Sequence, residues 1–388
     1  MSKIEELIKE LCPNGVEFKK LSELCGTITT GKLNANAMDE NGIYPFYTCD
    51  ENPYKINQYA FDTEAILISG NGSKVGHINY YKGKFNAYQR TYVIYDFLDI
   101  NVNFLLHYLK GYFKEYILAN SRKGSVPYIT LPILQNFKIP VPPTEVQREI
   151  VHILDDFSLL TAELTAELTA RQKQYEYYRD NLFNFSKEIN RCSLKDVCYS
   201  IKDGMHNLPK NNFDTDGYPI LSAQNIINGQ IEYNAKRYVN YDIYEKEQKR
   251  INIENDDVLL TIVATIGRTA IVKNNKMLLQ RSVCVLKPNK KILPKYLKYY
   301  LDTNDMQNYM KNNSKGSAQA GLYLQQVSNI LIPLPSLDEQ ERIVNILDRF
   351  DKLCNDISSG LPAEIEARKK QYEYYRDKLL DFEEFSKK

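Results

Sequence analysis

The sequence predicts an α+β protein in which one long unit, a globular head followed by a long helix, occurs twice. The main observation is an internal repeat: residues 170–185 (ARQKQYEYYRDNLFNF) and 367–382 (ARKKQYEYYRDKLLDF) are identical at 12 of 16 positions. Upstream, residues 137–157 (FKIPVPPTEVQREIVHILDDF) match residues 330–350 (ILIPLPSLDEQERIVNILDRF). A repeat of this length is a duplicated domain and not a solenoid unit.

Four segments follow from this repeat: a first head (1–143), a first long helix (144–186), a second head (187–335) and a second long helix (336–388). The helices have stayed alike, whereas the heads share only scattered landmarks. We therefore expect two equivalent docking surfaces joined to two different recognition surfaces, related by a pseudo-two-fold axis.

Each head alternates short strands and loops with one or two helices. Apolar, β-branched runs predict strands at Ala65–Ser69 and Val258–Ile262. Amphipathic patterns predict helices at Asn103–Lys114 and Pro294–Asn304.

Each long helix begins after prolines with the signature of a capping box, with Thr144 and Gln147 in the first repeat and Ser336 and Glu339 in the second. The first helix has no internal Gly or Pro up to about residue 185. The four extra residues of the second repeat fall in Ser358–Pro362. They predict either a coiled-coil stutter or, the interpretation we favour, a break or kink near 358–362.

Apolar residues recur in these helices at alternating steps of four and three, which predicts a coiled-coil seam. Because neither helix can bury its seam alone, we expect the two to pair as an antiparallel coiled coil. The predicted seam residues are Ile150, Leu154, Phe157, Leu164, Leu168, Tyr175, Tyr178, Leu182, Ile343, Leu347, Phe350, Tyr372, Tyr375 and Leu379.

Two helical features lie outside the seam. Tyr177, Arg179 and Asp180 could pack on the heads or form a partner surface, and the pattern leaves both open. Residues 161–168 are a tandem repeat, TAELTAEL. It could be simple helix-forming composition, or its unit count could set the distance between the two heads.

Composition excludes several protein classes. The seven cysteines are odd in number and include no CxxC pair, and the four histidines are far apart, so neither disulfides nor a metal site is expected. No signal peptide or membrane-spanning run is present, which predicts a soluble, cytoplasmic protein without membrane contact. Residues 187–335 hold 21 basic and 14 acidic side chains, against 15 and 14 in residues 1–143, so the second head is expected to bind a DNA backbone more strongly.

No complete catalytic motif was found. Gly26–Lys32 fits the start of a phosphate-binding loop, but Leu33 stands where a Ser or Thr must hold magnesium. Asn52-Pro53-Tyr54 lacks a proline of an amino-methyltransferase motif and is typical of a turn. Glu247-Gln248-Lys249 has no acidic partner motif of a nuclease and is interpreted as a solvated charge run.

Polar Gly/Ser loops with basic residues occur at matching places in both heads. Small residues let backbone N–H groups approach phosphates, Lys supplies charge, and Arg and Gln suit bidentate base contacts. The alternatives are plain turn chemistry and, for Gln89-Arg90 and Gln280-Arg281, hydrogen bonds within the head. The candidate DNA-binding residues are Ser73, Lys74, Gln89, Arg90, Lys123 and Ser125 in the first head, and Thr265, Arg268, Gln280, Arg281, Lys315 and Ser317 in the second.

The opening LCPNGVEFKKLSEL, together with the duplicated FKIPVPPTEVQREIVHIL and ILIPLPSLDEQERIVNIL, resembles the specificity subunit of type I restriction-modification systems over the whole chain. The resemblance implies two target-recognition domains, each reading one half of a bipartite, asymmetric site in double-stranded DNA. It also implies helices that dock two methyltransferase subunits, with restriction subunits completing the complex.

The resemblance further implies a non-catalytic chain that needs no cofactor, whereas its partners use S-adenosylmethionine, ATP and Mg. Two other functions compete with it. A coiled-coil adaptor with two protein-binding heads would explain the helices but not the basic second head. A self-contained DNA enzyme is disfavoured by the missing motifs.

Overall fold

The computed structural model of the chain describes residues 3–120, 128–186, 188–207, 217–314, 321–356 and 359–385. These residues form two compact units. Unit 1 contains Met1–Glu163 and Ile365–Lys388, and unit 2 contains Leu164–Glu364. Helices and strands both contribute to each unit, as the α+β prediction requires.

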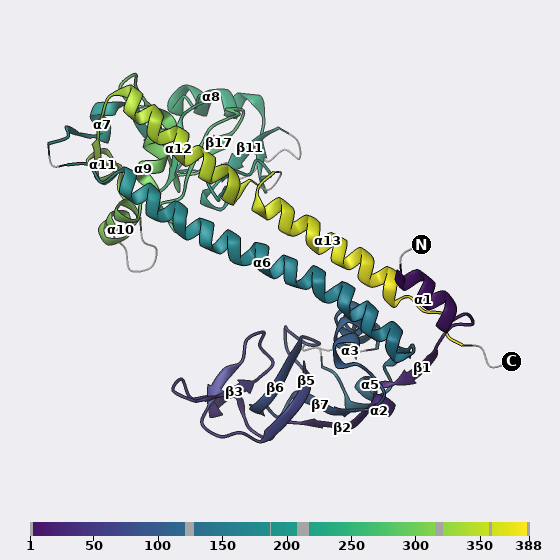
Figure 1. Cartoon of the computed structure of the whole chain (residues 1–388). Helices are drawn as coiled ribbons and strands as arrows, with labels where there is room; N and C mark the ends of the chain where they lie inside the picture. Colours follow the sequence, from purple (N-terminus) through teal and green to yellow (C-terminus); the bar gives the residue numbers. More distant parts are fainter. Residues whose placement is uncertain are drawn as a thin grey trace. The chain divides into compact units, whose positions relative to one another are not determined.

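Unit 1 is built on a six-stranded sheet in the order β2-β7-β5-β6-β3-β4 (Figure 1). The predicted strand Ala65–Ser69 is the end of its central strand β5, which pairs antiparallel with both β6 and β7. The strands are β2 (Cys25–Thr30), β3 (Tyr44–Tyr47), β4 (Tyr54–Ile56), β5 (Phe61–Ser69), β6 (Ile78–Ala87) and β7 (Thr91–Phe97).

The helices of the first head pack against one face of this sheet. The predicted helix of this head begins as α3, passes through a π-helical turn called η2 and continues as α4. The helical segments are α1 (Lys3–Leu11), α2 (Leu21–Leu24), η1 (Ala35–Ala37), α3 (Val102–Tyr108), η2 (Leu109–Phe113), α4 (Lys114–Asn120) and α5 (Leu131–Gln135).

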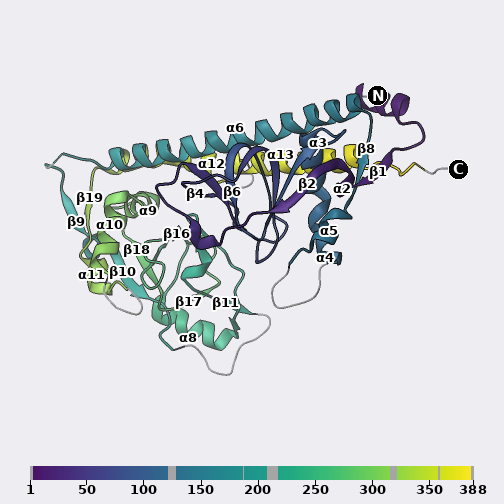
Figure 2. The same cartoon turned by 90° about the horizontal axis from the view of Figure 1, so that it is seen from below.

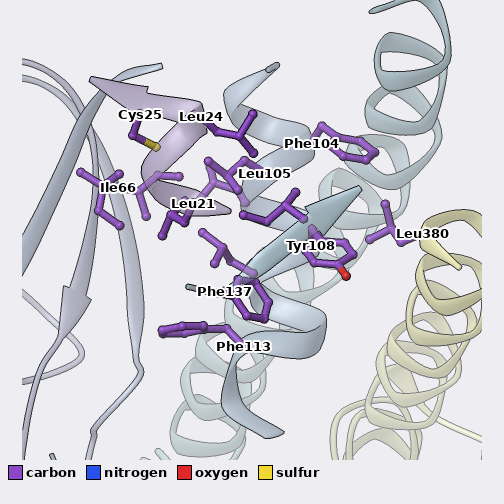
Figure 3. Packing of buried hydrophobic residues seen from close by; sticks show 14 of the residues in the cluster. Leu21, Leu24, Cys25, Ile66, Phe104, Leu105, Tyr108, Phe113, Phe137 and Leu380 are labelled. Carbon is purple, nitrogen blue, oxygen red and sulfur yellow. The ribbon is translucent and has the colours of Figure 1, made fainter. Parts of the chain in front are cut away.

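Buried apolar side chains from head and long helices form one core in unit 1. Figure 3 shows Leu21 of α2, Phe104 of α3 and Phe137 gathered with Leu380, which comes from the last helix of the chain. The seam residues Ile150 and Leu154 belong to the same cluster. The seam is therefore buried against the head as well as against the other helix.

Both ends of the chain contribute to unit 1. Strand β1 (Glu17–Lys20) pairs with β8 (Lys138–Val141) just before the first long helix. Beside β1, the Val16 N–H donates to the Glu383 carbonyl at 2.9 Å, and the Phe385 N–H donates to the Val16 carbonyl at 2.8 Å. Gly15 has φ +87°, and a Cβ there would lie 2.4 Å from the Glu383 carbonyl oxygen, so only glycine fits.

Unit 2 divides the corresponding strands among smaller sheets. A four-stranded sheet has the order β10-β18-β15-β16, and a three-stranded sheet has the order β14-β11-β17. The strands are β9 (Arg191–Ser193), β10 (Cys198–Asp203), β11 (Tyr218–Leu221), β12 (Ile226–Ile227), β13 (Gln230–Ile231), β14 (Tyr238–Val239), β15 (Val258–Thr261), β16 (Thr269–Ile271), β17 (Leu278–Leu279), β18 (Val283–Pro288) and β19 (Leu331–Pro333).

The second head also has its own helices, and α8 lies beside β17 (Figure 2). Where unit 1 has one continuous helical run through η2, unit 2 has two separate helices, α9 and α10. The helical segments of this head are α7 (Leu194–Val197), η3 (Ala223–Asn225), α8 (Tyr241–Ile251), α9 (Pro294–Leu301), α10 (Asn304–Asn313) and α11 (Leu324–Ser328).

The first long helix is α6 (Thr144–Leu182), 39 residues long. The second is interrupted: α12 (Leu337–Asn355) ends before α13 (Leu361–Leu380) begins. Gly360 lies in this interval, and its ideal Cβ would be within 3 Å of three carbonyl oxygens of the preceding turn. No helix among the described residues is long and apolar enough to cross a membrane.

The helices run antiparallel within each unit. In unit 1, Phe157 of α6 stacks on Tyr375 of α13 with ring centroids 5.1 Å apart, while Ile150, earlier in α6, shares a cluster with the later residue Leu379. In unit 2, Phe350 of α12 lies between Tyr175 and Tyr178 of α6, at 6.2 and 5.6 Å.

The remaining predicted seam residues differ in burial. Ile343 and Leu347 are buried, and Leu182 and Phe350 pack against the same core of unit 2. Leu164 and Leu168 are only half-buried. Tyr178 and Tyr375 are 43% and 39% exposed, so these two rings lie at the edge of the helix pair.

The capping-box prediction is correct for the Ser336 hydroxyl but wrong for the side chains of Glu339 and Gln147. The Ser336 hydroxyl accepts the Glu339 N–H at 3.3 Å, but the Glu339 carboxylate pairs with Arg342. Gln147 does not bond back to the start of its helix as a capping box requires. Its amide is buried and bonds to the Asn101 N–H and the Pro142 carbonyl, because the head leaves these two backbone groups without another partner at the junction.

Candidate DNA-binding interface

The loop that follows β5 meets two other segments at the edge of the first head. The Gly70 N–H donates to the Arg90 carbonyl at 2.9 Å, and the Ile129 N–H donates to the Gly70 carbonyl at 2.8 Å. This arrangement follows from the sheet, because Ser69 at the end of β5 pairs with Thr91 at the start of β7. The turn Tyr88–Arg90 is therefore held beside the loop.

These segments enclose a first hollow of about 170 Å³, lined by Thr30, Gly70, Asn71, Gln89, Arg90, Tyr92, Tyr128 and Ile129. Gln89 donates from Nε2 to Asn34 Oδ1 at 2.7 Å, so its side chain takes part in a hydrogen bond within the head. The exposed Arg90 side chain makes no hydrogen bond or ion pair with any described residue. Its guanidinium can therefore reach an outside acceptor.

Ser73 and Lys74 lie on the same loop but border a different cavity. This cavity, which we call the lysine hollow, has a volume of about 440 Å³. Lys74 forms an ion pair with Glu51, and this contact lowers the pKa of the Glu51 carboxyl. The lysine hollow is lined by Glu51, Ser73, Lys74, Val75, Gly76, His77, Ile78, Leu109, Lys110 and Lys114.

The second head repeats the backbone arrangement of the first. The Leu322 N–H donates to the Ile262 carbonyl at 2.8 Å, as Ile129 does to Gly70 in the first head. The Gln280 N–H donates to the Leu221 carbonyl at 2.8 Å, and the Ile262 N–H to the Ser282 carbonyl at 2.9 Å. The loop after β15 and the Gln280-Arg281 turn therefore lie together, as their counterparts do.

These segments enclose a second hollow of about 730 Å³. It brings together the predicted residues Thr265, Gln280 and Arg281. The second hollow is lined by Ile220, Ser222, Ala223, Gln224, Asn225, Asn234, Lys236, Arg237, Val263, Ala264, Thr265, Gln280, Arg281 and Ser282. Three exposed cationic side chains, Lys236, Arg237 and Arg281, give it a basic lining.

Arg268 is not among the residues of the second hollow. Its Nη1 donates to the Ile226 carbonyl at 3.1 Å, and it lines a separate junction pocket of about 320 Å³. The junction pocket consists of Tyr175, Arg179, Ile227, Asn228, Gly229, Gly267, Arg268, Thr269, Lys298, Asp302, Gln307, Asp351 and Asn355. The other four candidates, Lys123, Ser125, Lys315 and Ser317, lie outside the described residues.

The sequence pattern missed several residues of these hollows. Gln224, Lys236 and Arg237 line the second hollow, and Asn71 lines the first. The candidates were chosen at positions that correspond between the repeats, and these residues come from segments where the heads differ. The basic pair Lys236-Arg237 was the available signal.

The hollows contain groups suited to DNA and no recognisable catalytic set. Arg and Gln side chains can bind base edges, and Lys can neutralise phosphates. Among the described residues, no group of three or more His, Cys, Asp or Glu side chains could hold a metal ion. Gly26–Thr30 lies in strand β2, so these residues form no phosphate-binding loop, and Glu247-Gln248-Lys249 lies within α8.

The repeated tyrosine segment packs on the second head in α6 and on the first head in α13, where Tyr372 contacts His107. Arg179 is 7% exposed, and Asp180 Oδ1 accepts the Asn304 N–H at 3.2 Å, so both residues pack on the second head. Tyr177 is 66% exposed, and its counterpart Tyr374 is 63% exposed. Arg179 and Asp180 therefore pack on a head, and the partner surface at Tyr177 stays a prediction.

Comparison with known proteins identifies the family. Residues 13–171 and 186–367 each match the family described as "Type I restriction modification DNA specificity domain". The chain belongs to this family. Its two copies of the domain agree with the internal repeat, and each copy includes one head and part of the long helix that follows.

Relatives of this family extend over nearly the whole chain. A putative type I restriction enzyme specificity subunit of Haemophilus influenzae is 32% identical over 95% of this chain and 96% of its own length. The EcoR124I/EcoR124II specificity subunit of Escherichia coli is 30% identical over 82% of this chain and 87% of its own.

Solved structures show the same fold at low sequence identity. The specificity subunit of Mycoplasma genitalium superposes with a TM-score of 0.56 at 15% identity, covering 94% of this chain and 96% of that one. A chain from a study of type I restriction-modification assembly has a TM-score of 0.61 at 18% identity, covering 95% and 98%.

Proposed function

We propose that this type I specificity chain recognises a bipartite, asymmetric DNA sequence, with one half-site read by each head. In this proposal residues 1–143 and 187–335 are the target-recognition domains, and residues 144–186 and 336–388 are the helical segments. The observation that carries it is the pair of hollows at corresponding backbone positions with different linings. Equivalent frameworks that present different side chains suit two different half-sites.

The first hollow, the second hollow and the lysine hollow together supply side chains for contacts with base edges and with phosphates. Arg90 in the first head and Arg281 in the second are exposed at the matching turns and can make bidentate contacts to base edges. Lys236 and the side chains of the lysine hollow are suited to phosphates. The family supports this DNA role over the alternative of a protein-binding adaptor.

The proposal also assigns partners and chemistry. Two methyltransferase subunits dock on the long helices, and restriction subunits join that core. Methylation and cleavage belong to those subunits, which use S-adenosylmethionine, ATP and Mg, while this chain chooses the site. The exposed and repeated Tyr177 and Tyr374 support two equivalent docking positions.

Co-expression of the chain with a type I methyltransferase subunit from the same genome tests this proposal. We expect the two proteins to co-purify and the modified adenines, mapped by sequencing, to fall in one bipartite asymmetric sequence. Arg90→Ala should relax specificity in one half-site and Arg281→Ala in the other. Modification without any shared sequence, or relaxation of both half-sites by either single variant, would contradict it.

A further inference from the structure

The strongest unassigned feature is the lysine hollow of the first head. It joins lysines from three elements: Lys74 from the loop after β5, Lys110 from η2 and Lys114 from the start of α4. Glu51 is the one carboxylate in its lining, and it is paired with Lys74. Lys110 and Lys114 are exposed and have no ion pair with the described residues.

A histidine supplies a second and independent observation. His77 lines the same hollow, and its Nε2 atom is buried without a hydrogen-bond partner among the described residues. Leaving such a polar atom unsatisfied is costly, so a missing partner is expected. Because this atom has no exposed surface, a DNA phosphate does not reach it directly, and the exposed ammonium groups of Lys110 and Lys114 are the donors that face an outside anion.

The loop that carries Lys74 and His77 packs against the helical run that carries Lys110 and Lys114. Gly76, with φ +80°, ends the loop, and a Cβ there would lie 2.7 Å from Ile117 Cδ1. The loop is thus seated closely on α4. A π-helical turn is rare and often marks a functional site, and η2 carries Lys110.

The counterpart in the second head shows what makes the lysine hollow distinctive. His107 contacts Asp155 of α6, and Tyr299 contacts Asp348 of α12 at 2.7 Å, so His107 and Tyr299 hold equivalent positions. Three residues further along, Lys110 corresponds to Asp302. In the junction pocket Asp302 is paired with the buried Lys298 at 2.9 Å. The Lys298 ammonium group is thus neutralised in the junction pocket, whereas Lys110 and Lys114 of the lysine hollow have no carboxylate partner among the described residues.

We propose that the lysine hollow binds a phosphate of the DNA backbone through the exposed ammonium groups of Lys110 and Lys114. The inference rests on the proposed function. It also changes the expectation drawn from net charge, because the first head, although nearly neutral overall, then has its own concentrated phosphate site. The loop after β5 lines both hollows, with Asn71 in the first hollow and Lys74 in the lysine hollow. In this proposal one loop therefore lies beside a phosphate on one side and a base on the other.

The test uses the full chain and a labelled duplex of random sequence, which reports backbone binding. We expect the double variant Lys110→Gln/Lys114→Gln to lower the slope of log affinity against log salt concentration by about 0.9, the contribution of one phosphate contact. The matched control Lys82→Gln/Lys84→Gln removes two lysines of β6 in the same head and should leave the slope unchanged.

The outcomes separate this site from the function on which it rests. If the wild-type chain binds no DNA, the proposed function fails. If it binds and the Lys110/Lys114 variant keeps the wild-type slope, the phosphate assignment fails alone. A third outcome concerns inorganic phosphate as the ligand. If it raises the melting temperature of the wild type but not of this variant, and the slope for DNA is the same in both proteins, the hollow binds free anions and the DNA assignment is overturned.

Discussion

At the scale of single residues, the two repeats use one buried glutamine each to fasten a long helix to its head. Gln147 accepts the Asn101 N–H at 2.7 Å, and Gln340 accepts the Leu293 N–H at 2.9 Å. Gln340 also donates to the Lys291 and Pro335 carbonyls. The same amide therefore satisfies backbone groups on both sides of each head-to-helix junction.

Replacing Gln340 by Ala should lower the melting temperature of the chain. The substitution leaves the part-buried Leu293 N–H and the Lys291 and Pro335 carbonyls without this partner, and each of these groups that is shielded from water costs about 1 to 3 kcal/mol. Gln172→Ala, at an exposed position of α6, is the control and should have little effect. Equal melting temperatures for the two variants would show that the glutamine junction does not stabilise the unit.

His107 predicts a pH dependence of stability in unit 1. Its two ring nitrogens lie 2.9 Å from Tyr372 Oη and from Asp155 Oδ1. Burial lowers the pKa of His107 below its ordinary value of 6.5, although the contact with Asp155 opposes this shift. The unfolded chain therefore takes up this proton more readily than the folded chain. The stabilising contribution is complete above pH 6.5 and is lost as the pH falls through the lowered pKa.

Thermal unfolding of the wild type and His107→Gln on both sides of pH 6.5 checks this prediction. The wild type should lose more stability on acidification than the variant, which has no titrating group at this position. Lys110 and Arg376 also disfavour the charged imidazole. Identical losses in the two proteins would mean that His107 contributes nothing to the pH dependence.

At the scale of elements, the two long helices differ although their sequences repeat. α6 is continuous and belongs to both units, whereas the second repeat is divided into α12 and α13. The tandem TAELTAEL lies in α6, where Glu163 ends unit 1 and Leu164 begins the contribution to unit 2. The side chains of this tandem are exposed or half-buried. We therefore expect that one four-residue TAEL can be added without disturbing a hydrophobic core.

Adding or deleting one TAEL should change the spacer between the two half-sites. Four helical residues correspond to about 6 Å of rise, or roughly one to two base pairs of DNA. Sequencing of modified adenines with each variant, co-expressed with the methyltransferase, measures the spacer. Both half-site sequences should stay the same, and an unchanged spacer would refute the role of α6 as a ruler.

At the scale of the whole molecule, the two repeats have similar surfaces on their long helices and different surfaces on their heads. Tyr177-Tyr178 of α6 and Tyr374-Tyr375 of α13 form the same edge-to-face ring pairs, at 5.6 and 5.3 Å. Tyr177 and Tyr374 are the more exposed members of these pairs, and exposed aromatic residues are common anchors of protein interfaces. The hollows of the heads, by contrast, differ in volume and lining.

If the tyrosine pairs bind equivalent partners, Tyr177→Ala and Tyr374→Ala should each weaken the binding of one methyltransferase subunit. The double variant should weaken both. Native mass spectrometry of the co-purified complex counts the bound subunits, and Tyr199→Ala, an exposed tyrosine of the second head, is the control. Loss of both subunits from either single variant would contradict two independent sites.

The sequence determined those features that depend on neighbouring residues or on comparison of the two repeats. The repeat itself, strand β5, the unbroken helix α6 and the family were all accessible, because periodicity, proline and glycine positions and duplicated segments are local signals. Arg90 and Arg281 were selected as candidate DNA-binding residues in the same way, since their turns correspond between the heads. The structure places each of them in the lining of a hollow.

Only the tertiary structure decided which side chains share a hollow. Lys74 joins Lys110 and Lys114 instead of Arg90, and Arg268 bonds to the Ile226 carbonyl outside the second hollow. Gln147 serves the head and not its own helix end. The physical reason is common to all three: a hollow or a side-chain hydrogen bond is made by segments far apart in the chain, and tertiary packing, not sequence spacing, brings them together.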